Sequence, residues 1–340
     1  MERHRPRAAL AVTQGDPSGI GVEIAIKAWR GRGPGTPPFF LLADPDHVVR
    51  QARALGLDAP VEACAPAEAT HVFGRALPIV PLVARVSGEP GTPCADDAPA
   101  TLEAIELGVS LVRAGEASAL VTNPINKDVL YKAGFRHPGH TEWLGELAER
   151  QWNTGPLTPV MLLWSPLLAV IPVTIHVSLA RAIGELTTEK IVAISRIAAR
   201  DMRQKFGLSA PRLAVAGLNP HAGENGSMGR EDIEIVAPAV EILRAEGVDA
   251  RGPLPPDTMF HAAARARYDV AICMYHDQAL IPIKTLAFDS GVNTTLGLPF
   301  ARTSPDHGTA YDIAGKGVAN EASLVAAIEL AGRLAADARV

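Results

Sequence analysis

Short apolar runs alternate along the chain with longer stretches in which apolar residues recur every three or four positions. The short runs are typical of buried strands, and the longer period is typical of helices that bury one face. We predict strands at residues 8–12, 39–43, 119–122, 212–217 and 270–274. We predict helices at residues 22–29, 46–55, 98–114, 188–206, 233–245 and 321–336. Strands that alternate with helices indicate an α/β fold built of crossover units.

The most apolar stretch covers residues 160–177, and Ser165, Pro166 and Pro172 interrupt it. A membrane helix needs about 20 consecutive apolar residues, which this stretch lacks. We therefore predict two buried strands joined by a turn, and no membrane partner. Loops are predicted where Pro and Gly cluster, at residues 31–38, 88–93 and 251–256.

The composition indicates which partners and which compartment to expect. The chain has 340 residues, of which 47% are hydrophobic, which is enough for one large core or for two lobes. There are 32 basic and 37 acidic residues without a long basic stretch, which argues against a nucleic acid partner. Residues 1–7 are basic, but no apolar signal-peptide core follows them. Cys64, Cys94 and Cys273 are scattered and odd in number, so a reducing cytoplasm is expected.

A glycine-rich loop, residues 15–21 (GDPSGIG), lies between a predicted strand and a predicted helix. Glycines there permit a tight turn and a close approach of the backbone, and the following helix N-terminus could favour an anion. The spacing matches neither the dinucleotide fingerprint G-x-G-x-x-G nor a phosphate-binding P-loop. A structural turn is therefore the preferred interpretation of the spacing.

Three histidines follow apolar strands in polar surroundings. His176 ends an apolar run, His221 follows residues 212–217, and His276 follows residues 270–274. In open α/β sheets ligands collect beyond the carboxyl ends of the strands, so all three could meet there. Three neutral imidazoles would leave a divalent metal with open positions for a substrate. The alternative is that each histidine is an ordinary surface or hydrogen-bonded residue, since no short H-x-x-x-H pair is present.

Residues 306–317 form a second segment that is rich in glycine and small polar residues. Such a segment can wrap a ligand closely with backbone groups, and Asp312 could accept hydrogen bonds from ribose hydroxyls. An ordinary surface loop is the alternative interpretation.

Six short motifs occur in a fixed order over nearly the whole chain. They are GDPSGIG (15–21), TNP (122–124), GHTE (139–142), LNPHAGE (218–224), YHDQ (275–278) and TLGLP (295–299). In this combination the chain resembles the 4-hydroxythreonine-4-phosphate dehydrogenase family. It also resembles, more distantly, the isopropylmalate and isocitrate dehydrogenases, whose G-D-G-I-G-P-E and H-G-S-A-P-D-I-A-G-K stretches are similar to residues 15–21 and 307–316.

The resemblance implies an isopropylmalate dehydrogenase-like α/β fold, with two α/β lobes, a central cleft and a homodimer. The nucleotide-binding lobe would be discontinuous and comprise residues 1–125 and 280–340. Residues 126–279 would form the lobe for metal, substrate and dimerisation. This is not a Rossmann fold, in agreement with the missing fingerprint.

The resemblance also implies roles for individual residues. His176, His221 and His276 match the family's metal ligands, and zinc suits three imidazoles, although magnesium or cobalt could serve. The substrate-binding positions of the family match His140, Thr141, Lys284, Asn293 and Arg302. The nucleotide, NAD or NADP, would lie against His307, Gly308, Thr309, Asp312 and Gly315. Asp277 and Asp257 are candidates for proton transfer.

The implied reaction is the NAD(P)-dependent oxidation of 4-phosphooxy-L-threonine to 2-amino-3-oxo-4-(phosphooxy)butanoate. This product loses carbon dioxide to give 3-amino-2-oxopropyl phosphate, in pyridoxine 5'-phosphate biosynthesis. The site would lie at the subunit interface of the homodimer, with His276 reaching the metal of the partner.

Two other functions remain open. The first is a paralogous dehydrogenase of a phosphorylated sugar acid or an aromatic cis-dihydrodiol, for which the motifs would be nearly unchanged. The second is a non-catalytic protein that binds a metal or a nucleotide. The polar set His140, Lys284 and Arg302 argues against the second, because a simple binder needs no such group.

Overall fold

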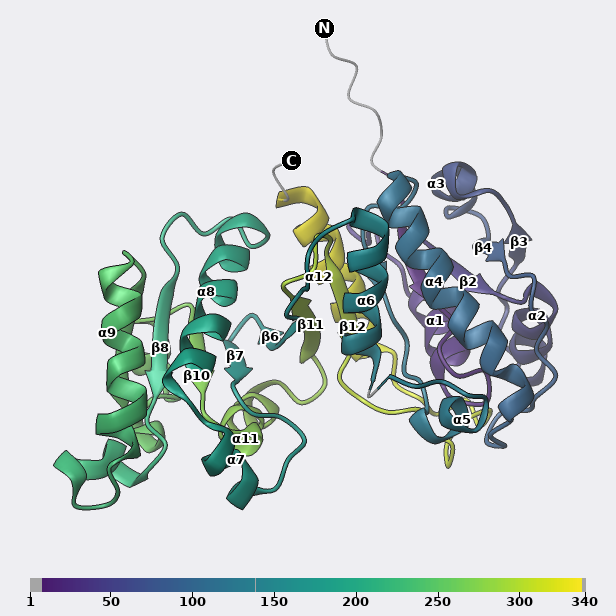
Figure 1. Ribbon diagram of the computed structural model, residues 1–340. Helices are drawn as coiled ribbons and strands as arrows, with labels where there is room; N and C mark the ends of the chain where they lie inside the picture. Colours follow the sequence, from purple (N-terminus) through teal and green to yellow (C-terminus); the bar gives the residue numbers. More distant parts are fainter. Residues whose placement is uncertain (1–7, 138, 338–340) are drawn as a thin grey trace, which may run out of the picture. The chain divides into compact units, whose positions relative to one another are not determined.

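The computed structural model describes residues 8–137 and 139–337, and the basic segment 1–7 lies outside them. The chain divides into two compact units, each of them α/β (Figure 1). Unit 1 contains residues 8–159 and Leu298–Ala336, and unit 2 contains Val160–Gly297. The predicted lobes instead change at residues 125/126 and 279/280, and the functions assigned to them stay predictions.

Unit 1 is built on a parallel sheet with the strand order β3-β4-β2-β1-β5-β12. The strands are β1 Leu10–Thr13, β2 Phe39–Ala43, β3 Val61–Ala63, β4 Leu77–Pro81, β5 Leu120–Val121 and β12 Arg302–Pro305. All five residues of β2 are buried, because parallel strands in α/β folds are covered on both faces. This burial explains why β2 is a continuous apolar run in the sequence.

The helices of unit 1 pack around this sheet. They are α1 Gly21–Arg30, α2 Pro45–Ala54, α3 Ala69–Val72, α4 Ala98–Ala114, α5 Lys127–Lys132, α6 His140–Trp152 and α12 Ala322–Asp337. Helices α4 and α6 pack side by side and share a core with β1 and β2 (Figure 1). Glycine at position 115 ends α4 in the left-handed conformation, as is usual after a helix C-terminus.

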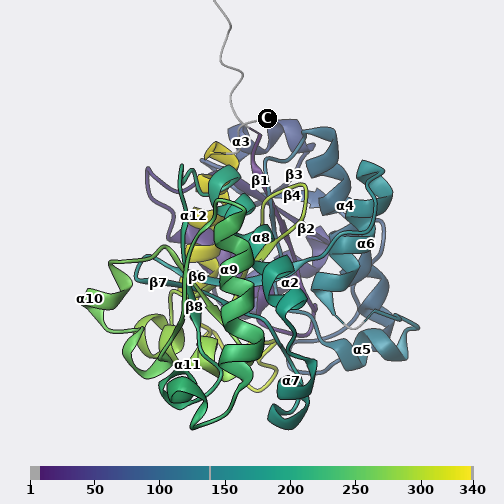
Figure 2. The same ribbon diagram turned by 60° about the vertical axis from the view of Figure 1, so that its left-hand side comes forward.

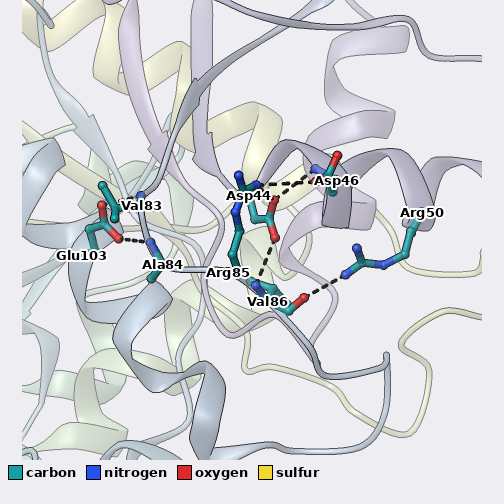
Figure 3. A network of polar contacts seen from close by, with 8 residues as sticks. All are labelled: Asp44, Asp46, Arg50, Val83, Ala84, Arg85, Val86 and Glu103. Carbon is teal, nitrogen blue, oxygen red and sulfur yellow. Dashed lines mark hydrogen bonds and ion pairs between the residues drawn. The ribbon is translucent and has the colours of Figure 1, made fainter.

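A polar network holds the chain segment after β4 against α2 (Figure 3). The buried Asp44 carboxylate caps α2 through the Asp46 N–H, and it also accepts hydrogen bonds from Arg85 and the Val86 N–H. Arg50 donates to the Val86 carbonyl from the same helix. Burial opposes ionisation of Asp44, but these hydrogen bonds outweigh it and hold its pKa below the ordinary value.

Asp44→Asn should therefore lower the free energy of unfolding by about 1 kcal/mol at neutral pH, through loss of charged hydrogen bonds. Because the folded pKa of Asp44 is lowered, its contribution is present above the ordinary aspartate pKa and disappears as the pH falls through the folded value. Urea denaturation at pH 7 and pH 3 measures this difference. Asp46→Asn, on the same helical turn but largely exposed, is the matched control. An equal loss at both pH values would contradict the assignment.

Unit 2 is built on a mixed sheet with the strand order β11-β6-β7-β10-β8-β9. The strands are β6 Val160–Ser165, β7 Leu168–Pro172, β8 Arg212–Ala216, β9 Asp249–Leu254, β10 Val270–Cys273 and β11 Val292–Leu296. The prediction of two strands in residues 160–177 is confirmed, since β6 and β7 form an antiparallel pair. Among the described residues, no helix has the length and apolar character that a membrane crossing requires.

The central strands of unit 2 bury alternate residues on opposite faces. In β10, Val270 and Ile272 join the core beneath α8 (Thr188–Gln204) and α9 (Ala237–Ala245), which lie side by side (Figures 1 and 2). Ala271 and Cys273 join the core beneath α11 (His276–Ala287). This alternation follows from the two-residue period of a strand. A π-helical turn, η4 (Asp232–Val236), leads into α9, and the shorter helices are α7 Leu179–Glu185 and α10 Ala262–Arg265.

One loop prediction is wrong. Residues 251–256 were expected to be a loop, but most of them belong to β9, which pairs in parallel with β8. β9 is an edge strand with a register irregularity, and Gly252 adopts a φ of 153° there. An edge position with a bulge tolerates Gly and Pro, which explains how this sequence forms a strand.

Candidate functional site

The three candidate metal-binding histidines follow three neighbouring strands of unit 2. Strands β7, β10 and β8 are adjacent and parallel, and they are followed by His176, His276 and His221 respectively. Because the carboxyl ends of parallel strands meet at one edge of a sheet, the predicted placement of these histidines is confirmed at the level of the sheet.

Buried hydrogen bonds tie these three strand ends together. The Gln278 side chain accepts a hydrogen bond from the Met274 N–H at 2.6 Å and donates one to the Gly217 carbonyl at 2.8 Å. The Thr174 hydroxyl donates to the Met274 carbonyl at 2.8 Å. Sequence reasoning did not find these positioning roles, although Gln278 stands in the motif YHDQ.

His176 and His276 approach each other within one chain. Their ring centroids lie 5.6 Å apart, and both rings line a cavity of about 180 Å³ between α7 and the N-terminus of α11. The Nδ1 atom of His276 lies 2.7 Å from Oδ1 of Asp277. A carboxylate in this position accepts from Nδ1–H and leaves Nε2 with its lone pair, which is the tautomer a metal ligand needs. Asp277 therefore orients His276, and a role for it in proton transfer stays a prediction.

His221 lies in a left-handed loop. Residues 221 to 225 all have positive φ, and four of them are not glycine. The buried Asp232 carboxylate holds the start of this loop, because it accepts hydrogen bonds from the backbone N–H groups of Leu218 and Asn219. Non-glycine residues in this conformation are strained, and such strain is often found at functional sites.

The donor chemistry suits a divalent metal, but one chain does not present a complete set of ligands. His221 is not among the residues that line the cavity beside His176 and His276. Within residues 8–137 and 139–337, no three His, Cys, Asp or Glu side chains lie close enough together to hold a metal ion. The structure thus brings two of the three predicted ligands together.

The predicted substrate-binding residues fall in both units. Lys284 lies on α11, with its ammonium group 5.7 Å from the centroid of the Phe288 ring, and Asn293 lies on β11. His140, Thr141 and Arg302 belong to unit 1. Asp257 lies in a short helical turn of unit 2 and is exposed, and its proposed part in proton transfer also stays a prediction.

In unit 1, the buried cation Arg302 acts electrostatically on His140. Arg302 begins β12, is buried, and donates two hydrogen bonds to the Thr122 hydroxyl, at 3.1 and 2.5 Å. Burial lowers the pKa of the Arg302 guanidinium to about 10. Burial and the positive charges of Arg302 and Lys127 lower the pKa of His140 well below its ordinary value. His140 is therefore a neutral donor or acceptor beside a buried cation.

The predicted nucleotide loop, residues 306–317, packs against the glycine-rich loop 15–21 within unit 1. Thr309 accepts a hydrogen bond from the Ile20 N–H at 3.0 Å, and the Tyr311 hydroxyl donates to Asp16 at 2.7 Å. A Cβ atom on Gly19 would lie 3.0 Å from the Thr309 carbonyl oxygen, so the close approach depends on glycine. The glycine-rich loop thus supports the second loop, a role that its spacing alone did not reveal.

The predicted nucleotide-binding residues differ in their surroundings. The Nδ1 atom of His307 lies 3.0 Å from the Gly308 carbonyl oxygen, and its Nε2 is shielded from solvent without a hydrogen-bond partner in the described chain. Asp312 and Gly315 are exposed. Asp312 is therefore accessible to a ribose, and its contact with one stays a prediction.

Comparison with known proteins shows the family. The family model described as "Pyridoxal phosphate biosynthetic protein PdxA" matches residues 36–331. A relative from Methylorubrum populi named 4-hydroxythreonine-4-phosphate dehydrogenase is 61% identical over 329 residues, which cover 96% of this chain and 94% of the relative.

Solved structures agree with this result. The crystal structure of 4-hydroxythreonine-4-phosphate dehydrogenase from Klebsiella pneumoniae is 39% identical, with 98% and 99% of the two chains covered and a TM-score of 0.86. A terephthalate 1,2-cis-dihydrodiol dehydrogenase from Burkholderia xenovorans is more distant, at 28% identity, 96% and 99% coverage and a TM-score of 0.64. The resemblance seen in the sequence motifs is confirmed, and the chain belongs to the PdxA family of pyridoxal phosphate biosynthetic proteins.

Proposed function

We propose that the protein is a metal-dependent NAD(P) 4-hydroxythreonine-4-phosphate dehydrogenase. It would oxidise the secondary alcohol of 4-phosphooxy-L-threonine to a β-keto acid, which then loses carbon dioxide. The observation that carries this proposal is the 61% identity to a relative of that name across almost the full length of both chains. The buried positive charge of Arg302 beside His140 supports a phosphorylated substrate.

His176, His221 and His276 would hold the divalent metal, with zinc as the first choice and magnesium or cobalt as alternatives. When bound, the metal would act as a Lewis acid that lowers the pKa of the substrate hydroxyl. The contact between Asp277 and Nδ1 of His276 supports this assignment, because it leaves Nε2 as the nitrogen that can bind a metal.

The remaining residues would bind and orient the substrate and the cofactor. Arg302, Lys284, Asn293, His140 and Thr141 would hold the phosphate and carboxylate groups, because charged and hydrogen-bonding donors favour anions. His307, Gly308, Thr309, Asp312 and Gly315 would contact the adenosine part of NAD or NADP. The free state of Cys64, Cys94 and Cys273 supports a cytoplasmic enzyme.

The active site would be shared between the subunits of a homodimer. His176 and His276 of one chain lie together, whereas His221 does not line their cavity. A set of three histidines therefore needs a ligand from a second chain or a movement of the loop around His221. We propose the second chain, and we follow the family resemblance in assigning His276 as the residue that reaches the metal of the partner.

A turnover assay tests the proposed function. Purified protein, stripped of metal and then supplied with zinc, cobalt or magnesium, should reduce NAD or NADP when given 4-phosphooxy-L-threonine. An aromatic cis-dihydrodiol and a phosphorylated sugar acid serve as competing substrates. Faster turnover of either competing substrate would overturn the assignment of the substrate. Absence of turnover with all three compounds would overturn the assignment as a dehydrogenase.

Tyr311→Phe tests the nucleotide loop. The variant removes the hydroxyl that donates to Asp16 and keeps the aromatic ring. A hydrogen bond to a charged group contributes about 1.5–3 kcal/mol, so the KM for NAD should rise roughly tenfold while kcat changes little.

Tyr268→Phe is the matched control for this variant, because its hydroxyl donates to the Met259 carbonyl in unit 2. Steady-state kinetics with varied NAD and saturating substrate give the comparison. An unchanged KM for NAD in Tyr311→Phe, together with a lower melting temperature, would show that the contact has only a structural role.

A further inference from the structure

The ammonium group of Lys127 lies beside the N-terminus of helix α6. A Cβ atom placed on Gly139, the residue that precedes this helix, would lie 3.1 Å from Nζ of Lys127 and 3.2 Å from its Cε. Lys127 itself begins α5, whose N-terminus is capped by the Asn126 side chain. The short helix α5 therefore fixes the backbone of Lys127, and the side chain extends to the start of α6.

Lys127 and Arg302 act on the same imidazole. After burial, the charges of Arg302 and then Lys127 are the main causes of the lowered pKa of His140. The Nε2 atom of His140 is shielded from solvent and has no hydrogen-bond partner among the described residues. A buried polar atom without a hydrogen-bond partner is unfavourable, so a ligand that supplies the partner would be favoured.

Lys127 is also available to a ligand. In the described part of the chain its side chain forms no hydrogen bond and no ion pair, in contrast to Lys27, which is held by Glu23. One acid is close, since Oε2 of Glu142 would lie 3.1 Å from the same Cβ position on Gly139. Glu142 nevertheless does not pair with Lys127 in the described part of the chain, which leaves the ammonium group for an external anion.

The N-terminus of α6 adds to this preference. The helix has 13 residues, and its N-cap residue, Gly139, has no side chain that could cap the first turn. Free N–H groups and the helix dipole favour a negative charge at such an end. Two cations, a neutral imidazole and a helix N-terminus match a phosphate dianion better than a carboxylate with a single charge.

We infer that Lys127 is a further substrate-binding residue, which joins Arg302 and His140 in holding the phosphate group of the substrate at the start of α6. This inference rests on the proposed function and deepens it, because it assigns the phosphate to unit 1. Lys127 determines specificity in this arrangement, since its contribution depends on the charge of the phosphate.

The test compares phosphorylated with unphosphorylated 4-hydroxythreonine in Lys127→Ala. The value of kcat/KM for the phosphorylated substrate should fall by about 10- to 100-fold, while that for the unphosphorylated substrate should change less than twofold. Lys127→Arg should retain most of the preference for phosphate. Lys132→Ala removes an exposed lysine from the other end of α5 and should leave both values unchanged.

An equal loss on both substrates, or no loss on either, would overturn the inference. Binding of inorganic phosphate tests the inference independently of the proposed reaction. Millimolar phosphate should raise the melting temperature of the parent protein more than that of Lys127→Ala, whether or not the protein turns over the proposed substrate. If the shift is the same in both, Lys127 does not bind phosphate.

Discussion

An equal mixture of His176→Ala and His276→Ala subunits that have exchanged partners should recover about a quarter of the parental activity, although each variant alone is nearly inactive. If His276 completes the site of the partner, one site of each hybrid collects both defects and the other is intact. Random reassortment of equal amounts makes about half of the dimers hybrid, and half of their sites work. The recovered quarter would show that the ligands come from two chains.

The experiment requires real subunit exchange. The two variants are co-expressed, or unfolded and refolded together, and native mass spectrometry confirms the hybrid dimers. Bound metal is measured in the same samples, and it should follow the recovered activity. Each variant should remain folded, because both histidines stand in the segments that follow β7 and β10 and outside the cores of unit 2.

A second mixture distinguishes the other arrangement that the structure permits. The rings of His176 and His276 lie 5.6 Å apart in one chain, so these two could serve one site while His221 arrives from the partner. In that case a mixture of His176→Ala and His221→Ala would recover about a quarter of the parental activity, and the first mixture would recover none. Recovery in neither mixture, with hybrids confirmed, would place all three ligands in one chain.

Arg302→Ala should cause the second large effect, a selective loss of kcat/KM for the phosphorylated substrate. Removing one partner of a buried charged contact costs about 2–5 kcal/mol, or roughly 30-fold to several thousand-fold. Arg302 is only 3% exposed, so water cannot replace the lost guanidinium effectively. The affinity for NAD, measured by fluorescence quenching, should change little.

Two controls keep this prediction interpretable. Arg302→Lys retains the charge and should lose less than Arg302→Ala, but it cannot reproduce both hydrogen bonds to Thr122. Melting temperatures identify any general loss of folding. If the parent enzyme uses unphosphorylated 4-hydroxythreonine as well as the phosphate ester, a phosphate anchor at Arg302 is contradicted.

The sequence predicted best those strands that are buried on both faces. Residues 39–43 and the pair within 160–177 are continuous apolar runs, and both predictions match the structure. The last two strands, β11 (VNTTL) and β12 (RTSP), were not predicted because they contain mostly polar residues. These are the strands that carry Asn293 and Arg302, so two candidate substrate-binding side chains lie where the apolar pattern is weak.

Two helices at the candidate site were missed for a related reason. Helices α6 and α11 begin at His140 and His276, and neither is preceded by a capping Ser, Thr, Asp or Asn. Pro282 inside α11 is a further signal against a helix. The histidines that follow the strands could be placed from the sequence. The contact between Tyr311 and Asp16 could not, because it depends on how two segments far apart in the sequence approach each other.

The left-handed backbone at two of the candidate ligands has a consequence for protein engineering. His176 and His221 both have a φ of 52°, a conformation in which glycine is relaxed and other residues are not. A library selected for thermal stability alone should therefore enrich glycine at these two positions, and with it chains that have lost an imidazole. The most stable sequence and the most active one would then diverge at the candidate metal ligands, so directed evolution would have to select for both properties together.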